Sequence, residues 1–335
     1  MTGAVARTRL PASSALREIQ APIAQRLEDV VAEMRRVVTA ELPLIEQVSG
    51  HLLQMRGKMF RPTLALLASE TAGAPAPRVV TLAAVVELMH LASLVHDDSV
   101  DHSALRRGLP TVNSLFSHQV SVIMGDFLYS RALEALVGMG DLDLLRVLTS
   151  VSTQLTIGEM RQLAAVDALS FTEAEYESLI GAKTASLLSA ACETGAMCGA
   201  AQHRAALRLY GERLGMAFQV ADDILDYTET ASVTGKPSGL DLREHKVTLP
   251  LIAALPRLSA GERGRVEALF AQDAPADDQI ADVVVLVTEA GGIEHARRRG
   301  EQFAREAEEA LDGLPDTPAR NALADAIIYV MDRRS

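Results

Sequence analysis

The sequence predicts an all-α protein built as one large bundle of ten or more helices. Between short stretches rich in Gly and Pro, apolar residues recur at i, i+3, i+4 and i+7, which is the period of an amphipathic helix. The alternating β-branched runs and Asn-Gly turns that are typical of sheets are missing. Trp is absent and aromatic residues make up 4% of the chain, so Leu, Ala, Val and Met must form a closely packed helical core.

Local signals place several helix starts in order along the chain. Pro62 suits the first turn of a helix, because its missing N–H would have no partner there. Residues 79–102 then carry an apolar face at helical spacing. Two capping boxes are predicted further on, at Thr172-x-x-Glu175 and Ser259-x-x-Glu262.

The chain has 335 residues, 48% apolar and 23% charged, which is typical of a globular protein with a sizeable core. No linker-like segment and no repeat of solenoid length divides it. We therefore expect a flexible N-terminus at residues 1–17 and a single all-helical domain at residues 18–335.

The net charge of −12 argues against nucleic acid or an anionic membrane as a partner, but it suits a site that gathers metal cations. Two cysteines are too few for a disulfide framework, which favours a reducing cytoplasm. The N-terminal residues lack the apolar region of a secretory signal. Glu87 and His90 interrupt the most apolar stretch, residues 79–95, so no membrane span is expected.

Two aspartate clusters with the pattern DDxxD carry the strongest chemical signal. They comprise Asp97, Asp98 and Asp101 in the first cluster, and Asp222, Asp223 and Asp226 in the second. Positions i and i+4 share a helix face, so the first and last aspartate of each cluster project side by side. Carboxylates inside apolar helical runs are costly unless cations compensate them. Oxygen-only ligands favour Mg²⁺, which prefers a few carboxylates plus substrate phosphate oxygens, and so the clusters predict a phosphorylated substrate.

Basic residues suited to phosphate binding accompany both clusters. Arg106 and Arg107 follow the first cluster, and Lys58 and Arg61 precede the helix start at Pro62. Lys183 interrupts an otherwise apolar helix face, where a lone buried Lys would be expensive. Further lysines punctuate the second half at Lys236 and Lys246. These groups together predict a site for two diphosphates, one bound through metal and one held by Lys and Arg.

In its full set of motifs the chain resembles the trans-isoprenyl diphosphate synthases of the polyprenyl synthetase family. The motifs are GKxxRP at 57–62, His90, HDDxxDxxxxRRG at 96–108, GD at 125–126, KT at 183–184, FQxxDDxLD at 218–226 and GKxxGxDLxxxK at 235–246. Leu240 and His245 are mild variations within the last motif. The resemblance implies an all-α fold around a central cavity, usually in a homodimer.

The resemblance also assigns roles. It implies that about three Mg²⁺ ions bind with the substrate, and their ligands would be Asp97, Asp101 and Asp222, with Asp98 and Asp226 as ligands or supports. The allylic diphosphate would be held by Arg106, Lys183, Thr184, Gln219 and Lys246, with Lys236 helping to close the site. Isopentenyl diphosphate would be held by Lys58, Arg61, His90 and Arg107. A lone His such as His90 in an apolar helix is otherwise an ordinary core residue.

The implied reaction is head-to-tail condensation of isopentenyl diphosphate with an allylic diphosphate. In this family, bulky residues four and five positions before the first aspartate stop chain growth, whereas here they are Ala92 and Ser93, with the flexible Met89 one turn deeper. We therefore expect a product of about C30 to C50, because each isoprene unit must pack against apolar wall. A C20 or farnesyl product is the alternative. A long product would be handed to a membrane enzyme.

Three other interpretations were weighed against this one. A terpene cyclase would carry NDxxSxxxE in place of the second DDxxD. A metal phosphohydrolase is suggested by His96 next to Asp97, but such a site needs further His ligands. The other histidines of the sequence show no pairing of that kind. A non-catalytic subunit would be expected to lack some of the six aspartates, although their presence leaves open a need for a partner subunit. The exact product, the allylic primer and the pathway stay open.

Overall fold

The structure is a computed structural model that describes residues 12–55, 57–73, 76–164, 168–228 and 239–332. The first half contains α1 (Ala12–Gln20), η1 (Ala21–Ile23), α2 (Ala24–Val38), α3 (Pro43–Gln54), α4 (Phe60–Glu70), α5 (Val79–Val100), β1 (Leu105–Arg106), β2 (Leu109–Pro110), α6 (Val112–Leu115), α7 (His118–Gly138) and α8 (Leu142–Ala164). The second half contains η2 (Ala168–Ser170), α9 (Glu173–Ile180), the π-helix η3 (Gly181–Ala185), α10 (Ser186–Gly199), η4 (Ala201–His203), α11 (Arg204–Thr228), α13 (Leu240–Arg243), α14 (Leu249–Ala254), η5 (Leu255–Arg257), α15 (Ala260–Phe270), α16 (Asp277–Glu289), α17 (Gly292–Glu309) and α18 (Pro318–Met331).

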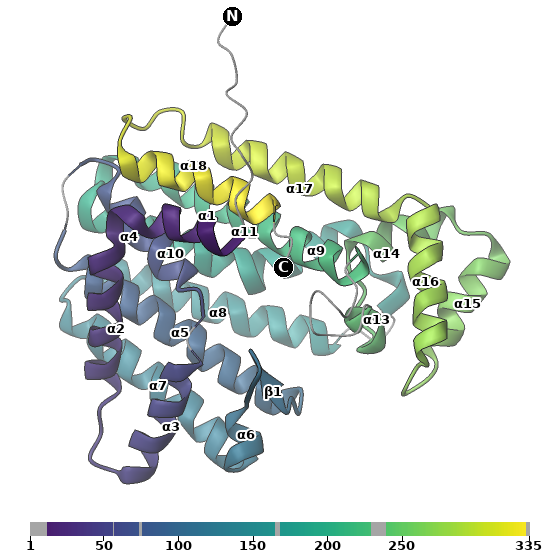
Figure 1. Cartoon of the computed structure of the whole chain (residues 1–335), viewed down its shortest axis with the longest axis horizontal. Coiled ribbons are helices and arrows are strands. Elements are labelled where there is room, and N and C mark those ends of the chain that lie inside the picture. Colours follow the sequence, from purple (N-terminus) through teal and green to yellow (C-terminus); the bar gives the residue numbers. More distant parts are fainter. Residues whose placement is uncertain (1–11, 56, 74–75, 165–167, 229–238, 333–335) are drawn as a thin grey trace, which may run out of the picture.

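Helix α5 forms the centre of the bundle, in contact with α2, α4, α7 and α10 (Figure 1). Its residues 82–86 are all fully buried, and consecutive buried positions require neighbours on every side of a helix. One main apolar cluster runs from α1 to α18 through these contacts. The apolar helix therefore positions the aspartates at its C-terminal end against a rigid core.

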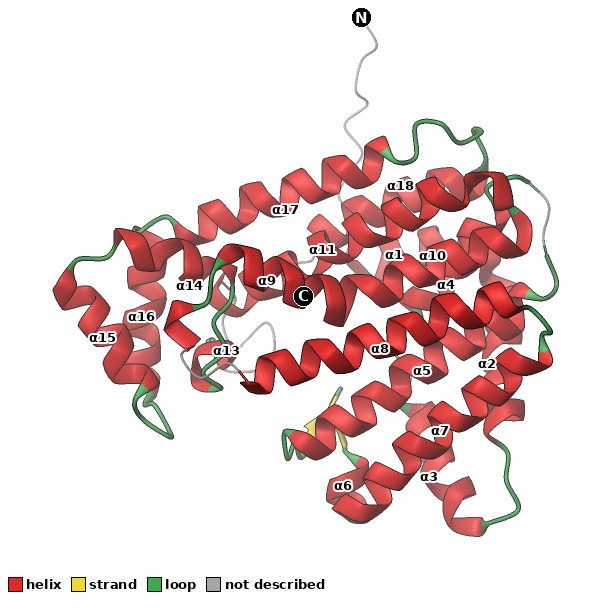
Figure 2. Ribbon diagram, turned by 180° about the vertical axis from the view of Figure 1, so that it is seen from behind, coloured by secondary structure: helices red, strands yellow, loops and turns green. Residues whose placement is uncertain are grey.

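Helix α11 carries the second aspartate cluster and packs between α10 and α17. A second, smaller apolar cluster joins the end of α11 to α13, α14, α15 and α16, with Leu242, Leu251 and Val266 fully buried. The ribbon view shows α15 and α16 at one end of the bundle, beyond α13 and α14 (Figure 2). This smaller cluster holds the segment that follows the second aspartate motif.

The all-helical prediction is confirmed, and the one sheet among the described residues is the two-stranded hairpin of β1 and β2. Both capping boxes are also confirmed, because the Thr172 and Ser259 hydroxyls accept from the backbone N–H groups of Glu175 and Glu262. The first described helix begins at Ala12, with Leu16 and Ile19 buried where α1 packs against α18.

Within the described residues, α5 is also the one helix long and apolar enough to cross a membrane by length and composition. Two thirds of its most apolar window (67%) is buried inside the protein. Such burial is what the central helix of a bundle shows, and α5 fills that position here.

Candidate active site

The first aspartate cluster lies at the C-terminal end of α5, and its three members have different surroundings. Asp97 is partly buried, Asp98 is 3% exposed, and Asp101 is exposed at the C-cap, where its N–H donates to the Asp97 carbonyl at 2.8 Å. Burial raises the pKa of Asp97 to about 6, with the nearby Lys183 charge opposing the rise and Glu159 and Asp101 adding to it. Asp97 thus lies where a cation would be favoured.

The hairpin after α5 brings Arg106 back onto this cluster. Its Nε donates to Asp98 Oδ1 at 2.7 Å, and Asp98 is thereby paired inside the protein. The turn of the hairpin places Arg107 and Gly108 in the left-handed region, at φ 53° and 77°, as a tight turn of two residues requires. The two adjacent arginines therefore diverge, Arg106 toward the aspartates and Arg107 toward the start of α4.

A second basic group gathers around the start of α4. Arg107 Nη1 donates to the Met55 carbonyl at 2.7 Å, and its guanidinium fills the space that a side chain at Gly57 would need, 2.5 Å from the Cβ position. Lys58 is exposed, with Nζ 5.7 Å from the centroid of the Tyr329 ring. Glycine at position 57 is thus required for the close approach of the arginine.

The basic group faces α5 at Glu87 and His90. Burial, and then the charges of Arg61, Arg107 and Arg106, lower the pKa of His90 well below its ordinary value, so the imidazole is neutral. Glu87 is 6% exposed, and burial raises its pKa although Arg61 and Arg107 oppose the rise. The residues expected to hold isopentenyl diphosphate are therefore brought together, and Glu87 is a neighbour that the sequence analysis did not assign.

The second cluster lies near the C-terminal end of α11. Asp222 is exposed, whereas Asp226 is partly buried and accepts the backbone N–H groups of Leu240 and Asp241, both at 3.0 Å. Asp226 thus holds the start of α13 through charge-assisted hydrogen bonds. Asp223, between them, is 4% exposed and points into the protein.

Asp223 belongs to a chain of hydrogen bonds that joins three segments of the protein. The Tyr176 hydroxyl donates to its Oδ2 at 2.5 Å, and Gln219 Nε2 donates to its Oδ1 at 2.7 Å. Thr184 Oγ1 in turn donates to Gln219 Oε1 at 2.7 Å. Thr184 and Gln219, both expected at the allylic diphosphate, are therefore in direct contact.

Lys183 is not alone in its apolar surroundings, because oxygens of a neighbouring helix pair with it. Its side chain is 34% exposed, and Nζ lies 2.7 Å from Glu159 Oε1 and 3.2 Å from Gln162 Oε1 on α8. Both partners lie on another helix, which is why the apolar surroundings in the sequence were misleading. The π-helix η3 presents Lys183 toward α8 and Thr184 toward α11, and such π-segments are common at functional sites.

Lys246 connects the two halves of the site electrostatically. Burial opposes its charge, but its hydrogen bond to Glu244 at 2.6 Å, with the charges of Asp241 and Asp101, raises its pKa overall. Burial raises the pKa of Asp241 to about 7, and Asp226 and Asp222 add to that rise while Lys246 opposes it. Lys246 is thus within electrostatic reach of residues from both aspartate segments. Lys236 lies outside the described residues.

In the described part of the chain, no group of three or more His, Cys, Asp or Glu side chains is close enough to hold a metal ion alone. The carboxylates present suit Mg²⁺ in another way, because this ion commonly binds one or two carboxylates and takes its other oxygens from substrate phosphates and water. The exposed Asp101 and Asp222 are open to such a shared complex.

His96, next to the first cluster, packs tightly against α7. Its Nε2 donates to the Val122 carbonyl at 3.1 Å and lies 3.4 Å from Asp126 Oδ1. A Cβ at Gly125 would come within 2.2 Å of the ring. The GD motif therefore provides the space and a carboxylate for this imidazole.

The residues expected to limit product length lie on α5, before the aspartates. Ala92 and Met89 are each 2% exposed, whereas Ser93 is partly buried and donates to the His90 carbonyl at 2.8 Å. Ser93 is therefore the most exposed of these three residues.

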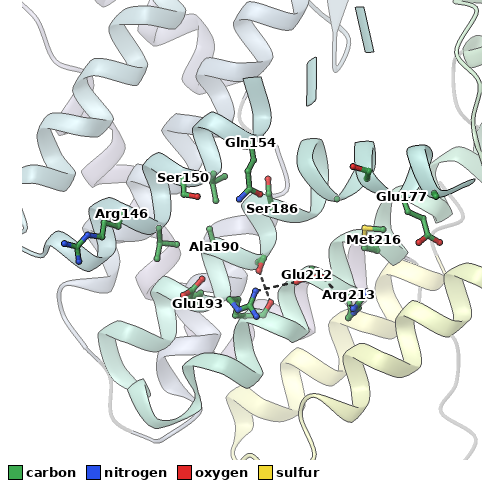
Figure 3. A pocket seen from close by; sticks show the side chains of 17 residues that line it. Arg146, Ser150, Gln154, Glu177, Ser186, Ala190, Glu193, Glu212, Arg213 and Met216 are labelled. Carbon is green, nitrogen blue, oxygen red and sulfur yellow. Dashed lines mark hydrogen bonds and ion pairs between the residues drawn. The ribbon is translucent and has the colours of Figure 1, made fainter. Parts of the chain in front are cut away.

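A separate opening of about 750 Å³ lies between α8, α9, α10 and α11 (Figure 3). Arg146 and Gln154 of α8, Glu193 of α10 and Met216 of α11 are among its lining residues. None of the residues that the sequence analysis assigned to the site lines it.

Comparison with known proteins agrees with this geometry. The chain is 35% identical to an all-trans-nonaprenyl-diphosphate synthase (geranyl-diphosphate specific) of Rhodobacter capsulatus, over 94% of this chain and 97% of that protein. A crystal structure of a decaprenyl diphosphate synthase from Rhodobacter capsulatus superposes with a TM-score of 0.90 at 36% identity, covering 96% of this chain and 99% of the other. A polyprenyl synthase from Caulobacter crescentus, solved with calcium and isoprenyl diphosphate, gives a TM-score of 0.89 at 33% identity, covering 96% and 98%. The family model described as polyprenyl synthetase matches residues 42–287, and the chain therefore belongs to the polyprenyl synthetase family.

Proposed function

We propose that this chain is a trans-prenyltransferase that condenses isopentenyl diphosphate with an allylic diphosphate, head to tail, to make a long-chain polyprenyl diphosphate. The observation that carries the proposal is the arrangement of the charged groups. Asp97 and Asp101 of α5 lie within electrostatic reach of Lys183 and Lys246, and the second aspartate cluster meets the same Lys246 through Asp241. Membership of the polyprenyl synthetase family supports these substrates.

The residues divide the work between two diphosphates. Arg106, Lys183 and Lys246 neutralise the allylic diphosphate, and Lys58, Arg61 and Arg107 bind isopentenyl diphosphate beside the neutral His90. Asp97, Asp101, Asp222 and Asp226 would hold Mg²⁺, which would supply positive charge to stabilise the departing diphosphate. Asp98, which is already paired with Arg106, supports that arginine.

The apolar surroundings favour condensation of the allylic cation over its reaction with water. As the allylic diphosphate leaves, an allylic cation forms, the double bond of isopentenyl diphosphate attacks it, and a proton is lost to the departing diphosphate. The buried apolar residues of α5 exclude water, which would otherwise quench the cation. No nucleophile from the protein is needed.

A long product is favoured over a C20 or farnesyl product. Small side chains at Ala92 and Ser93 leave room for growth along α5, and the flexible Met89 follows one turn deeper. Two of the similar proteins are named nonaprenyl and decaprenyl diphosphate synthase, which are names of long-chain enzymes. We expect a product of about C30 to C50, because its length is set by how many isoprene units pack against apolar wall.

Product analysis tests both the reaction and the length. The purified chain is incubated with Mg²⁺, farnesyl diphosphate and labelled isopentenyl diphosphate, and products are sized by mass. A ladder ending between about C30 and C50 is expected from the space argument above. A dominant C15 or C20 product would contradict the long-chain assignment, and no incorporation with or without a second subunit would contradict the reaction itself. EDTA should abolish turnover, and added Mg²⁺ should restore it.

We also propose that the chain acts as a homodimer through α7 and α8. Large apolar side chains are exposed along these two helices, with Ile123 64%, Val137 61%, Leu142 68% and Met160 60% exposed. Scattered exposed apolar residues are common, but this concentration on neighbouring helices favours a partner surface. Ile123→Asp should convert a dimer into a monomer in sedimentation velocity. A wild-type chain that sediments as a monomer would contradict the proposal.

The cellular setting follows from chemistry. Cys192 and Cys198 are free thiols, which suits the cytoplasm. A product of this length is strongly apolar, so an enzyme that consumes it is expected at a membrane. The soluble fraction of cells should contain the synthase activity, and the membrane fraction should contain the accumulated prenyl chain.

A further inference from the structure

We propose that Tyr176 and Asp223 are positioning residues that fix the direction of the Thr184 hydroxyl through Gln219. This inference rests on the proposed function, because it concerns the half of the site that holds the allylic diphosphate. Neither Tyr176 nor Asp223 was assigned a role by the sequence motifs. Hydrogen bonds between side chains join α9, α11 and η3 at this point.

The chain of contacts starts in the core. Tyr176 is 2% exposed and Asp223 is 4% exposed, so water competes little for their polar atoms. The tyrosine hydroxyl occupies one oxygen of the carboxylate at 2.5 Å, and the Gln219 amide occupies the other at 2.7 Å. Both oxygens of Asp223 thus have donors from the protein, and the carboxylate is buried, whereas the adjacent Asp222 is exposed.

The orientation of Gln219 follows from its bond to the carboxylate. Because its NH₂ group donates to Asp223, its carbonyl oxygen must point the other way, toward Thr184. The Thr184 hydroxyl then gives its only hydrogen to that oxygen at 2.7 Å. A group that enters the site beside Thr184 therefore meets an acceptor, and the donors for the diphosphate come from Lys183 and the other cations.

The first cluster shows the same division at the equivalent position. Asp98 is 3% exposed and bonds Arg106 at 2.7 Å, while its neighbours Asp97 and Asp101 have greater exposure. In both clusters the middle aspartate is thus directed at a protein residue of the allylic half. The first and last aspartates of each cluster are less buried than the middle one.

A matched pair of tyrosine variants tests the proposal. Tyr176→Phe removes the hydroxyl that orients Asp223. Tyr210→Phe is the matched control, because it removes a buried hydroxyl that donates at 2.8 Å to the Leu323 carbonyl and takes no part in the hydrogen bonds of Asp223. Both variants should lower the Tm to a similar degree. Tyr176→Phe alone should lower kcat/KM for the allylic diphosphate by about tenfold, with the KM for isopentenyl diphosphate unchanged. Equal activity of the two variants would overturn the proposal.

A double-mutant cycle asks whether the effect passes through Thr184. In the Thr184→Val background, Tyr176→Phe should cause no further loss, because the hydroxyl whose direction it controls is gone. The same fold-loss in both backgrounds would overturn the proposal. If Tyr176→Phe does not fold, Gln219→Met replaces it in the same cycle, since Gln219 is only partly buried and links the same groups.

Magnesium titration separates positioning from metal binding. Asp223→Asn should keep the Mg²⁺ concentration that gives half-maximal rate, while Asp222→Asn should raise it about tenfold or more. A similar rise in Asp223→Asn would assign Asp223 to the metal and overturn the proposal. A wild type that makes no prenyl product would contradict the proposed function. A wild type that is active, with variants that all behave alike, would contradict only the positioning role of Tyr176 and Asp223.

Discussion

Arg106 donates from its Nε to Asp98 Oδ1 across 2.7 Å, and 4% of the Asp98 side chain is exposed. The short hairpin that follows α5 folds back toward the helix, so that Arg106 contacts an aspartate eight residues earlier in the sequence. The pair does not by itself argue for high stability, since burying the Asp98 charge is costly although Arg106 is 30% exposed. Removing one partner leaves the other without compensation.

Asp98→Asn should therefore lower activity more than stability. The KM for the allylic diphosphate should rise because Arg106 loses its anchor, whereas the free energy of unfolding should fall by no more than about 1 kcal/mol, because burial raises the pKa of Asp98 and its charge is itself costly in the folded protein. Chemical denaturation and steady-state kinetics measure the two effects. Asp143→Asn is the control, because its pair with Arg146 is exposed on both sides and should contribute little. Equal effects of the two variants would contradict the prediction.

Gly125→Ala should disturb the first aspartate cluster from a distance. The new Cβ would come within 2.2 Å of the His96 ring, and the ring would have to leave its contacts with Val122 and Asp126. We expect a loss of about 2 kcal/mol or more in unfolding free energy and a fall in kcat.

The partner substitution His96→Ala should restore stability in the double variant, because the clashing ring is gone. Gly138→Ala is the control at the end of the same helix, where no atom lies within 4 Å of the added Cβ. A Gly125→Ala protein with wild-type Tm would show that α5 and α7 separate easily here.

Bulky substitutions before the first aspartate should shorten the product. Ser93→Phe should act most cleanly, since Ser93 is only partly buried, and Ala92→Phe should also shorten the product but lower the Tm more, because Ala92 is 2% exposed. Mass analysis of products measures the length. Turnover of isopentenyl diphosphate should persist in both variants. Unchanged length in both would show that this face of α5 does not line the path of the growing chain.

The raised pKa of Asp97 predicts a pH dependence of stability in the absence of metal. Its pKa is 3.8 ordinarily and about 6 in the folded protein, so the folded state binds the proton more tightly than the unfolded state. Asp97 therefore costs little stability below pH 3.8, and the cost grows as the pH rises to about 6 and is constant above.

Asp97→Asn should thus be more stable than the wild type by about 2 kcal/mol at pH 8 in EDTA, with the difference vanishing toward pH 4. Thermal unfolding across this range measures the difference. Adding Mg²⁺ and inorganic diphosphate should reverse the order, because the cation compensates the carboxylate in the wild type only. A difference that is independent of pH would contradict the assignment.

The fold and the acidic part of the site could be predicted because they depend on local patterns. The apolar period marks the helices, the capping boxes mark two starts, and a DDxxD pattern on a helix necessarily places Asp97 beside Asp101. The same helical period contains a signal for Asp223 that was not used, since Gln219 lies four residues before it on the same face.

Contacts between distant segments could not be predicted in this way. Lys183 looked isolated because its partner Glu159 lies on another helix, and nothing local links Tyr176 to Asp223. The hairpin after α5 was missed because its strands have two residues each, too few for any alternation to show. Its turn depends on the left-handed backbone of Arg107, a residue type that rarely adopts it.

The buried length of α5 has a consequence for how enzymes of this kind diversify. The acidic end of the helix and the residues around Val85 and Val86 are separated by about three helical turns. A substitution near Val85 lies far from the ion-binding end, and we expect it to alter product length without weakening ion binding. Product length and catalysis should then be adjustable by separate single substitutions along α5.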